Sequence, residues 1–126
     1  MRKTLSLLVV TLVLIFVAPV LAATVTVSGT ADSMHHFIYF FGSGAGDVTV
    51  TSTFVPQRNK GYTLLVSRDG ADVCRVDTSF QGWSHPVLAE TQMSCTDPAG
   101  PGGTYKVEFY PSKGGSIDFD LTVTTP

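Results

Sequence analysis

Three carboxylates near the end of the chain have the residue types of a calcium site. Asp118 and Asp120 are two residues apart, so on an extended strand both side chains point to the same face of a sheet. Glu108 lies across from them if the segments 105–110 and 117–123 form a hairpin. Hard cations bind several carboxylate oxygens, so this set predicts calcium-supported binding. The alternative is a solvated acidic face, partly offset by Lys106 and Lys113.

Other polar sets predict less chemistry. Asp69, Asp72 and Asp77 surround a turn and form a second acidic cluster, where a loop-borne calcium ion is the alternative. Ser84 and His85 could be combined with Asp72 or Asp77 as a catalytic triad, but no G-x-S-x-G elbow occurs. The sequence therefore predicts a protein that is not an enzyme.

The three histidines do not predict a zinc site. His35 and His36 are adjacent, so on a strand their side chains point to opposite faces. His85 could join only one of them, and two imidazoles make a poor zinc site. We expect surface or half-buried histidines.

Aromatic side chains are the other candidate for binding. The run from Phe37 to Phe41 (FIYFF) favours a strand, with Tyr39 and its odd-numbered neighbours on one face. An outward face would present rings to a sugar or a protein, whereas a central strand would bury them. Trp83, the only tryptophan, lies in a Gly/Ser/His loop. Tyr39 and Trp83 are therefore candidate ligand-binding residues.

The N-terminal segment predicts export. Arg2 and Lys3 precede an apolar run from Leu5 to Val17, and a small residue, Ala22, follows a Val-Leu pair. This pattern is typical of a cleaved secretory signal over residues 1–22, so we expect a secreted, extracellular or cell-surface protein. The alternative is a membrane anchor. Pro19 and the Thr/Val alternation that begins at Thr24 disfavour it, because both interrupt the helical pattern.

The remaining residues, 23–126, have the size of one domain. Removal of the signal leaves six basic residues against ten acidic ones, a net charge of −4 that argues against binding nucleic acid. Cys74 and Cys95 predict one disulfide in an exported chain, and free buried thiols are the alternative. Closing a loop of about twenty residues would stabilise the fold by roughly 3 kcal/mol.

Short alternating segments separated by Gly, Pro and Asp predict an all-β fold. Seven or eight such strands indicate an antiparallel β-sandwich or jelly roll. The predicted strands cover residues 24–28, 37–41, 47–54, 62–67, 72–78, 87–95, 105–110 and 117–123. The Pro/Gly-rich residues 97–103 are expected to form a loop.

Three turns predict hairpins. Asp69-Gly70 is a tight-turn signal. A Gly-rich turn over 42–46 joins the aromatic strand to the Val/Thr strand, and a Pro/Gly turn over 111–115 joins the last two strands. Pairing Tyr110 with Ser116 in this last hairpin places Glu108 opposite Asp118, a like-charged pair that a bound cation would relieve.

Three segments together resemble the bacterial pre-peptidase C-terminal domain. They are the aromatic strand, Gly turn and Val/Thr strand from His36 to Phe54, the segment from Tyr62 to Gly70 (YTLLVSRDG), and the Gly-Thr-Tyr to Asp-Phe-Asp-Leu-Thr-Val stretch from Gly103 to Val123. The family is a small jelly-roll-like sandwich found beside secreted peptidases and other extracellular enzymes. The resemblance implies a non-catalytic binding module for a polysaccharide or a protein partner.

The alternative function is structural. The Thr-rich segments 24–28 and 121–125 could pair with neighbouring subunits by strand addition, building an extracellular filament or surface layer.

Overall fold

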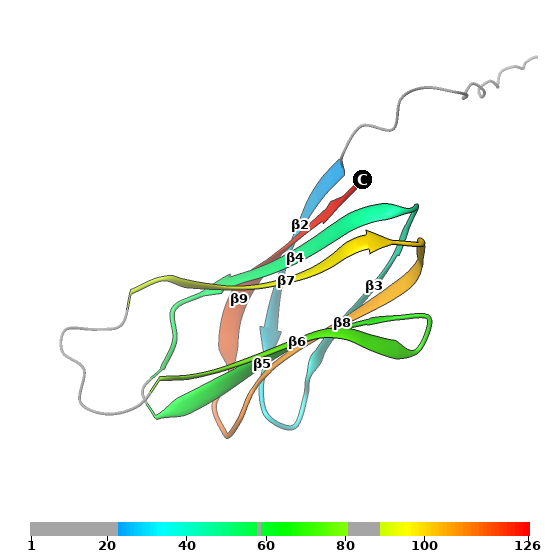
Figure 1. Ribbon diagram of the computed structural model, residues 1–126. Coiled ribbons are helices and arrows are strands. Elements are labelled where there is room, and N and C mark those ends of the chain that lie inside the picture. The colour runs from blue at the N-terminus through cyan, green and yellow to red at the C-terminus, as the bar shows by residue number, and fades with distance from the viewer. Residues whose placement is uncertain (1–22, 58, 81–88) are drawn as a thin grey trace, which may run out of the picture.

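A computed structural model of the 126-residue chain describes residues 23–57, 59–80 and 89–126. These residues form eight β-strands in two packed sheets (Figure 1). The strands are β2 (Ala23–Ala31), β3 (Phe37–Ser43), β4 (Gly46–Phe54), β5 (Lys60–Arg68), β6 (Ala71–Phe80), β7 (Thr91–Gly100), β8 (Gly103–Pro111) and β9 (Ile117–Thr125). Within the described ranges, no helix is long and apolar enough to cross a membrane.

Both sheets have four antiparallel strands. One has the order β2-β9-β4-β7 and the other the order β3-β8-β5-β6. Apart from the β5–β6 hairpin, each strand lies in the opposite sheet from the one before it, which is the arrangement of a jelly roll. The predicted antiparallel sandwich is confirmed, and the strand order selects the jelly roll.

Alternating residues decide what each strand buries. In β4, Val48, Val50 and Phe54 face the core, while the threonines between them point outward, as their spacing predicts. The same alternation in β8 and β9 buries Tyr105, Val107, Phe109, Phe119 and Leu121 between the sheets. The outer faces are therefore left to polar side chains and to the residues that could bind a ligand.

Two of the three predicted hairpins are wrong. β8 pairs with β3 and β5, whereas β9 pairs with β2 and β4, so the last two strands lie in different sheets. β3 and β4 are separated in the same way. The turns after β3 and after β8 cross from one sheet to the other, so the strands that they join do not pair with each other. Alternating strands on both sides of a short turn fit either arrangement, because both bury the same face of each strand.

The Asp69-Gly70 hairpin between β5 and β6 is confirmed. Arg68 pairs with Ala71, and both turn residues have positive φ, 50° for Asp69 and 87° for Gly70. Two positive φ values are what a two-residue turn between twisted strands requires.

The expected loop over 97–103 is wrong in part. β7 extends to Gly100, through Pro98. Within the described ranges β7 pairs only with β4, so it is an edge strand, where a residue without an N–H is tolerated. Ala99 adopts a φ of 51° and donates its N–H to Asp47 Oδ1 at 2.7 Å, which holds this irregular end in place.

The predicted disulfide is confirmed. Cys74 on β6 and Cys95 on β7 are bonded, with their Cα atoms 5.7 Å apart. β6 and β7 are edge strands of different sheets. The disulfide therefore joins the two layers along one side of the sandwich.

Candidate binding site

The structure separates the predicted calcium ligands. Glu108 points outward from β8, and its neighbours across the ladders are Ile38 and Leu65. Asp118 and Asp120 point outward from β9, in the other sheet. The carboxylates thus lie on opposite faces of the molecule. No group of three or more His, Cys, Asp or Glu side chains that could hold a metal ion occurs in the described part of the chain.

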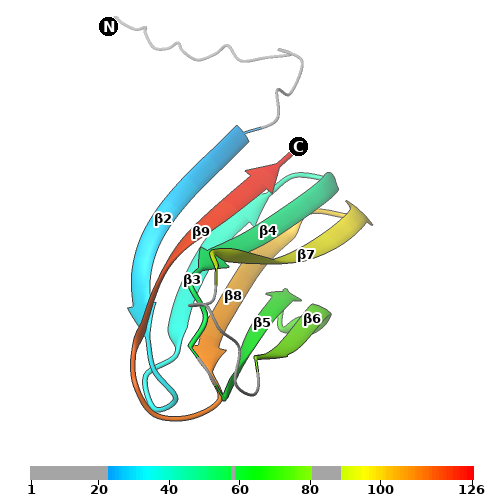
Figure 2. The same cartoon turned by 90° about the vertical axis from the view of Figure 1, so that its left-hand side faces the viewer.

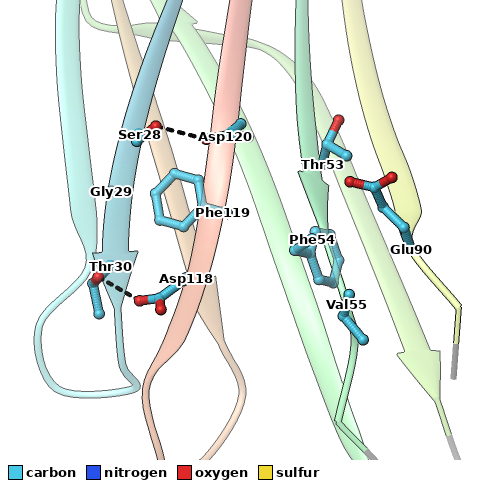
Figure 3. Close-up of a pocket in the computed structure, with 10 residues that line it drawn as sticks. All are labelled: Ser28, Gly29, Thr30, Thr53, Phe54, Val55, Glu90, Asp118, Phe119 and Asp120. Atoms are coloured by element: carbon cyan, nitrogen blue, oxygen red, sulfur yellow. Dashed lines mark hydrogen bonds between the residues drawn. The ribbon is translucent and has the colours of Figure 1, made fainter. Parts of the chain in front are cut away.

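Asp118 and Asp120 instead line an open hollow of about 540 Å³ (Figure 3). Thr30 Oγ1 donates to Asp118 at 2.7 Å, and Ser28 Oγ donates to Asp120 at 2.6 Å, both from the neighbouring strand β2. Glu90 lies across the hollow (Figure 3). The hollow offers oxygen atoms but no exposed aromatic ring, since the two phenylalanines that line it are buried.

Tyr39, the aromatic candidate on β3, points toward the core and not toward solvent. Tyr39 pairs with the buried Val107 and packs half-buried against the core. Its neighbours Ile38 and Phe40 face solvent, and Phe40 is 62% exposed. β3 is an edge strand whose odd-numbered rings pack against the core, so its outward ring is Phe40. The other candidate, Trp83, and the residues Ser84 and His85 lie outside the described residues.

Phe40 begins a row of side chains that crosses the whole β3-β8-β5-β6 sheet. Phe40 pairs with Lys106, Lys106 with Ser67, and Ser67 with Asp72. These four residues line one hollow of about 370 Å³ on the outer face. An exposed ring, an ammonium group, a hydroxyl and a carboxylate therefore converge from four different strands.

The end of this hollow is fixed by the β5–β6 turn. Asp69 donates its backbone N–H to the Thr104 carbonyl at 2.8 Å, and its Oδ1 accepts the Thr104 N–H at 2.9 Å. Ser67 Oγ donates to Asp72 Oδ1 at 3.1 Å. Because the turn is tied to β8 on one side and to β5 on the other, the carboxylates of Asp69 and Asp72 are held at the rim.

A second row on the same face carries a paired histidine. The His36 ring stacks on Tyr110 with 3.7 Å between the ring centroids, and its Nδ1 lies 3.0 Å from Glu108 Oε2. Lys106 Nζ lies 3.7 Å from the other oxygen of Glu108. Glu108 thus pairs with both His36 and Lys106, and Lys106 is the cross-strand neighbour of Phe40.

The far edge of this face holds an ion pair. Arg75 Nε donates to Asp77 Oδ2 at 2.9 Å, and Thr63 Oγ1 donates to Asp77 Oδ1 at 2.6 Å. Arg75 first, and then Thr63, hold the pKa of Asp77 below its usual range. Asp77 therefore remains an ionised hydrogen-bond acceptor at neutral and mildly acidic pH.

The site was only partly visible in the sequence. The acidic turn residues Asp69 and Asp72 stood out, and both line the hollow. Lys106 and Ser67 were missed, since no local signal places them beside Phe40. The outward direction of Phe40 could not be predicted either, because the sequence does not show that Phe37, Tyr39 and Phe41 face the core.

No family model matches this chain, and no curated protein matches it.

Proposed function

We propose that this protein is a secreted, non-catalytic binding domain that holds a neutral polysaccharide across the outer face of the β3-β8-β5-β6 sheet. The observation that carries the proposal is the 62% exposed ring of Phe40 beside a hollow lined by Ser67, Asp72 and Lys106. A sugar ring has an apolar C–H face and a rim of hydroxyls. An aromatic ring can stack on the apolar face, and fixed hydrogen-bond acceptors and donors beside it can bind the hydroxyls.

Charge favours a neutral ligand. The chain carries a net charge of −2, and removal of the proposed signal makes it more negative. Its field would repel an acidic polysaccharide. The carboxylates of Asp69 and Asp72 can accept hydrogen bonds from sugar hydroxyls without having to be neutralised.

Three other features support the proposal. The resemblance to the pre-peptidase C-terminal domain implies a non-catalytic module, and the N-terminal pattern of the sequence implies export. The disulfide between Cys74 and Cys95 suits an oxidising compartment. Calcium is left out of the proposal, because the register that united Glu108 with Asp118 is absent.

Binding to a panel of immobilised neutral and acidic glycans, followed by titration calorimetry, tests the proposal. Phe40→Ala should weaken binding of a neutral glycan about tenfold, which corresponds to roughly 1.4 kcal/mol of lost contact. The matched control is Val55→Ala, which removes an apolar side chain of 48% exposure from the hollow on the other sheet. This control should bind as the unmodified protein does.

Two results would overturn the proposal. One is the absence of binding to every glycan in the panel. The other is equal binding by Phe40→Ala and Val55→Ala. Capture of a protein ligand that depends on Phe40, without any glycan binding, would assign the face to a protein partner instead.

Strand addition is the second candidate. Among the described residues, β2 pairs only with β9 and is an edge strand, and none of its nine residues is charged or proline. The second segment considered for strand addition, over 121–125, cannot serve. It belongs to β9, which is central and already paired on both sides with β2 and β4.

A further inference from the structure

One side of the sandwich carries two unprotected edge strands. β2 and β3 are edge strands of the two sheets, and the segments ATVTVSGTA and FIYFFGS contain no charged residue and no proline. Unpaired backbone N–H and C=O groups on such an edge are a template for another strand, which folded proteins usually block with charges, prolines or bulges.

The other pair of edges is blocked. β6 carries Asp72, Arg75 and Asp77, and β7 carries Asp97 and Pro98. Cys74 and Cys95 tie these two edges together. Figure 2 shows β2 and β7 at opposite edges of the same sheet. The side formed by β6 and β7 is therefore blocked against strand addition, and the opposite side, formed by β2 and β3, is not.

The inner face of β2 is incompletely covered. Val25 points inward, opposite the buried Val123 of β9, yet it is 47% exposed. On β3, the inward rings of Phe37, Tyr39 and Phe41 are only half-buried against the core. Apolar side chains that belong to the core thus reach solvent on this side, where an added strand would cover them.

We infer that β2 pairs antiparallel with β2 of a second copy, joining the two β2-β9-β4-β7 sheets into one eight-stranded sheet. A two-fold axis through the middle of the strand pairs even-numbered residues with even-numbered ones. Threonines then stay on the outer face, and Val25 and Val27 stay on the core face. Identical strands can meet in this way because β2 has no charged side chain that would face its own copy.

β2 is preferred over β3 because it is longer, with nine residues against seven. The contact is closed, so it produces a dimer and not a filament. The inference gives the strand-addition candidate one geometry and does not depend on polysaccharide binding.

Light scattering on a gel-filtration column and sedimentation equilibrium test the dimer, with the protein expressed as the full chain and purified after export. The unmodified protein should have twice the monomer mass over a wide range of concentration. Val25→Lys places a charge at the edge and should give a monomer with an unchanged circular dichroism spectrum. The matched control Val55→Lys adds the same charge at similar exposure, just after the end of β4, and should remain dimeric.

Three outcomes overturn the inference. A monomeric unmodified protein removes both the dimer and strand addition through β2. Equal masses for Val25→Lys and Val55→Lys remove β2 as the contact. Open multimers or filaments contradict the closed dimer but leave strand addition standing. Glycan binding by a monomeric protein would leave the proposed function intact.

Discussion

A partly buried polar cluster links the two sheets at the level of single residues. Asp97 on β7 forms an ion pair with Arg68 on β5 and accepts a hydrogen bond of 2.6 Å from the Tyr105 hydroxyl on β8. Tyr105 has no exposed surface. The hydrogen bond from Tyr105, followed by the pairing with Arg68, holds the pKa of Asp97 below its usual range, although burial acts in the opposite direction.

Tyr105→Phe should lower the free energy of unfolding by about 2 kcal/mol at neutral pH, since a charged acceptor loses a buried donor. Because the pKa of folded Asp97 is depressed, its stabilisation is present above the unfolded value of about 3.9 and is lost as pH falls through the folded pKa. The variant raises that pKa. Urea unfolding between pH 7 and pH 2 should therefore show the two proteins converging in acid.

Tyr39→Phe is the control for this prediction. It removes a hydroxyl from a half-buried ring that stacks on Phe41, whereas Asp97 receives its hydrogen bond from Tyr105, so the stability of this variant should follow the unmodified protein at every pH. A Tyr105→Phe curve that runs parallel to the unmodified protein down to pH 2 would contradict the role given to Asp97.

At the level of elements, the contact between β2 and β3 depends on a missing side chain. Gly29 lies on β2 directly opposite Phe119. A Cβ atom there would lie 2.7 Å from Phe37 Cε1 and 2.9 Å from Phe119 Cζ. These two rings pack edge to face, with centroids 4.9 Å apart. Gly29 therefore makes room for an aromatic pair between the two layers.

Gly29→Ala should destabilise the fold by roughly 1–3 kcal/mol, the usual effect of overpacking a core, and thermal unfolding measures it. Gly42→Ala is the matched control on β3, where a Cβ atom would meet nothing within 4 Å. Equal melting temperatures for the two variants would show that the rings move aside freely.

The positions and buried faces of most strands were predictable from the sequence, because alternation is a local property. The Thr/Val pattern of β4 and the Asp69-Gly70 turn each specified their local structure. The end of β7 was not predictable, since Pro98 is tolerated only because that strand proves to be an edge.

For the whole molecule, the Cys74–Cys95 bond closes the side opposite β2 and β3. Replacing both cysteines by serine should lower the free energy of unfolding by roughly 3 kcal/mol, because the unfolded chain regains the freedom of a loop of about twenty residues. Denaturation in guanidinium chloride measures the change. Reduction of the unmodified protein should reproduce it, and an unchanged midpoint in both cases would contradict the prediction.

The sequence by itself determined the fold class, the disulfide partners and the buried face of most strands. These follow from period-two alternation and from having only two cysteines. Apart from the β5–β6 hairpin, which the Asp69-Gly70 turn predicts, only the tertiary structure decided which strands are neighbours. The turn after β8 leads to the opposite sheet, so Glu108 and Asp118 lie on opposite faces, while Phe40 meets Lys106 and Ser67 across strands far apart in the chain. The choice of partner for the other strands depends on how all eight pack together, and no local pattern encodes it.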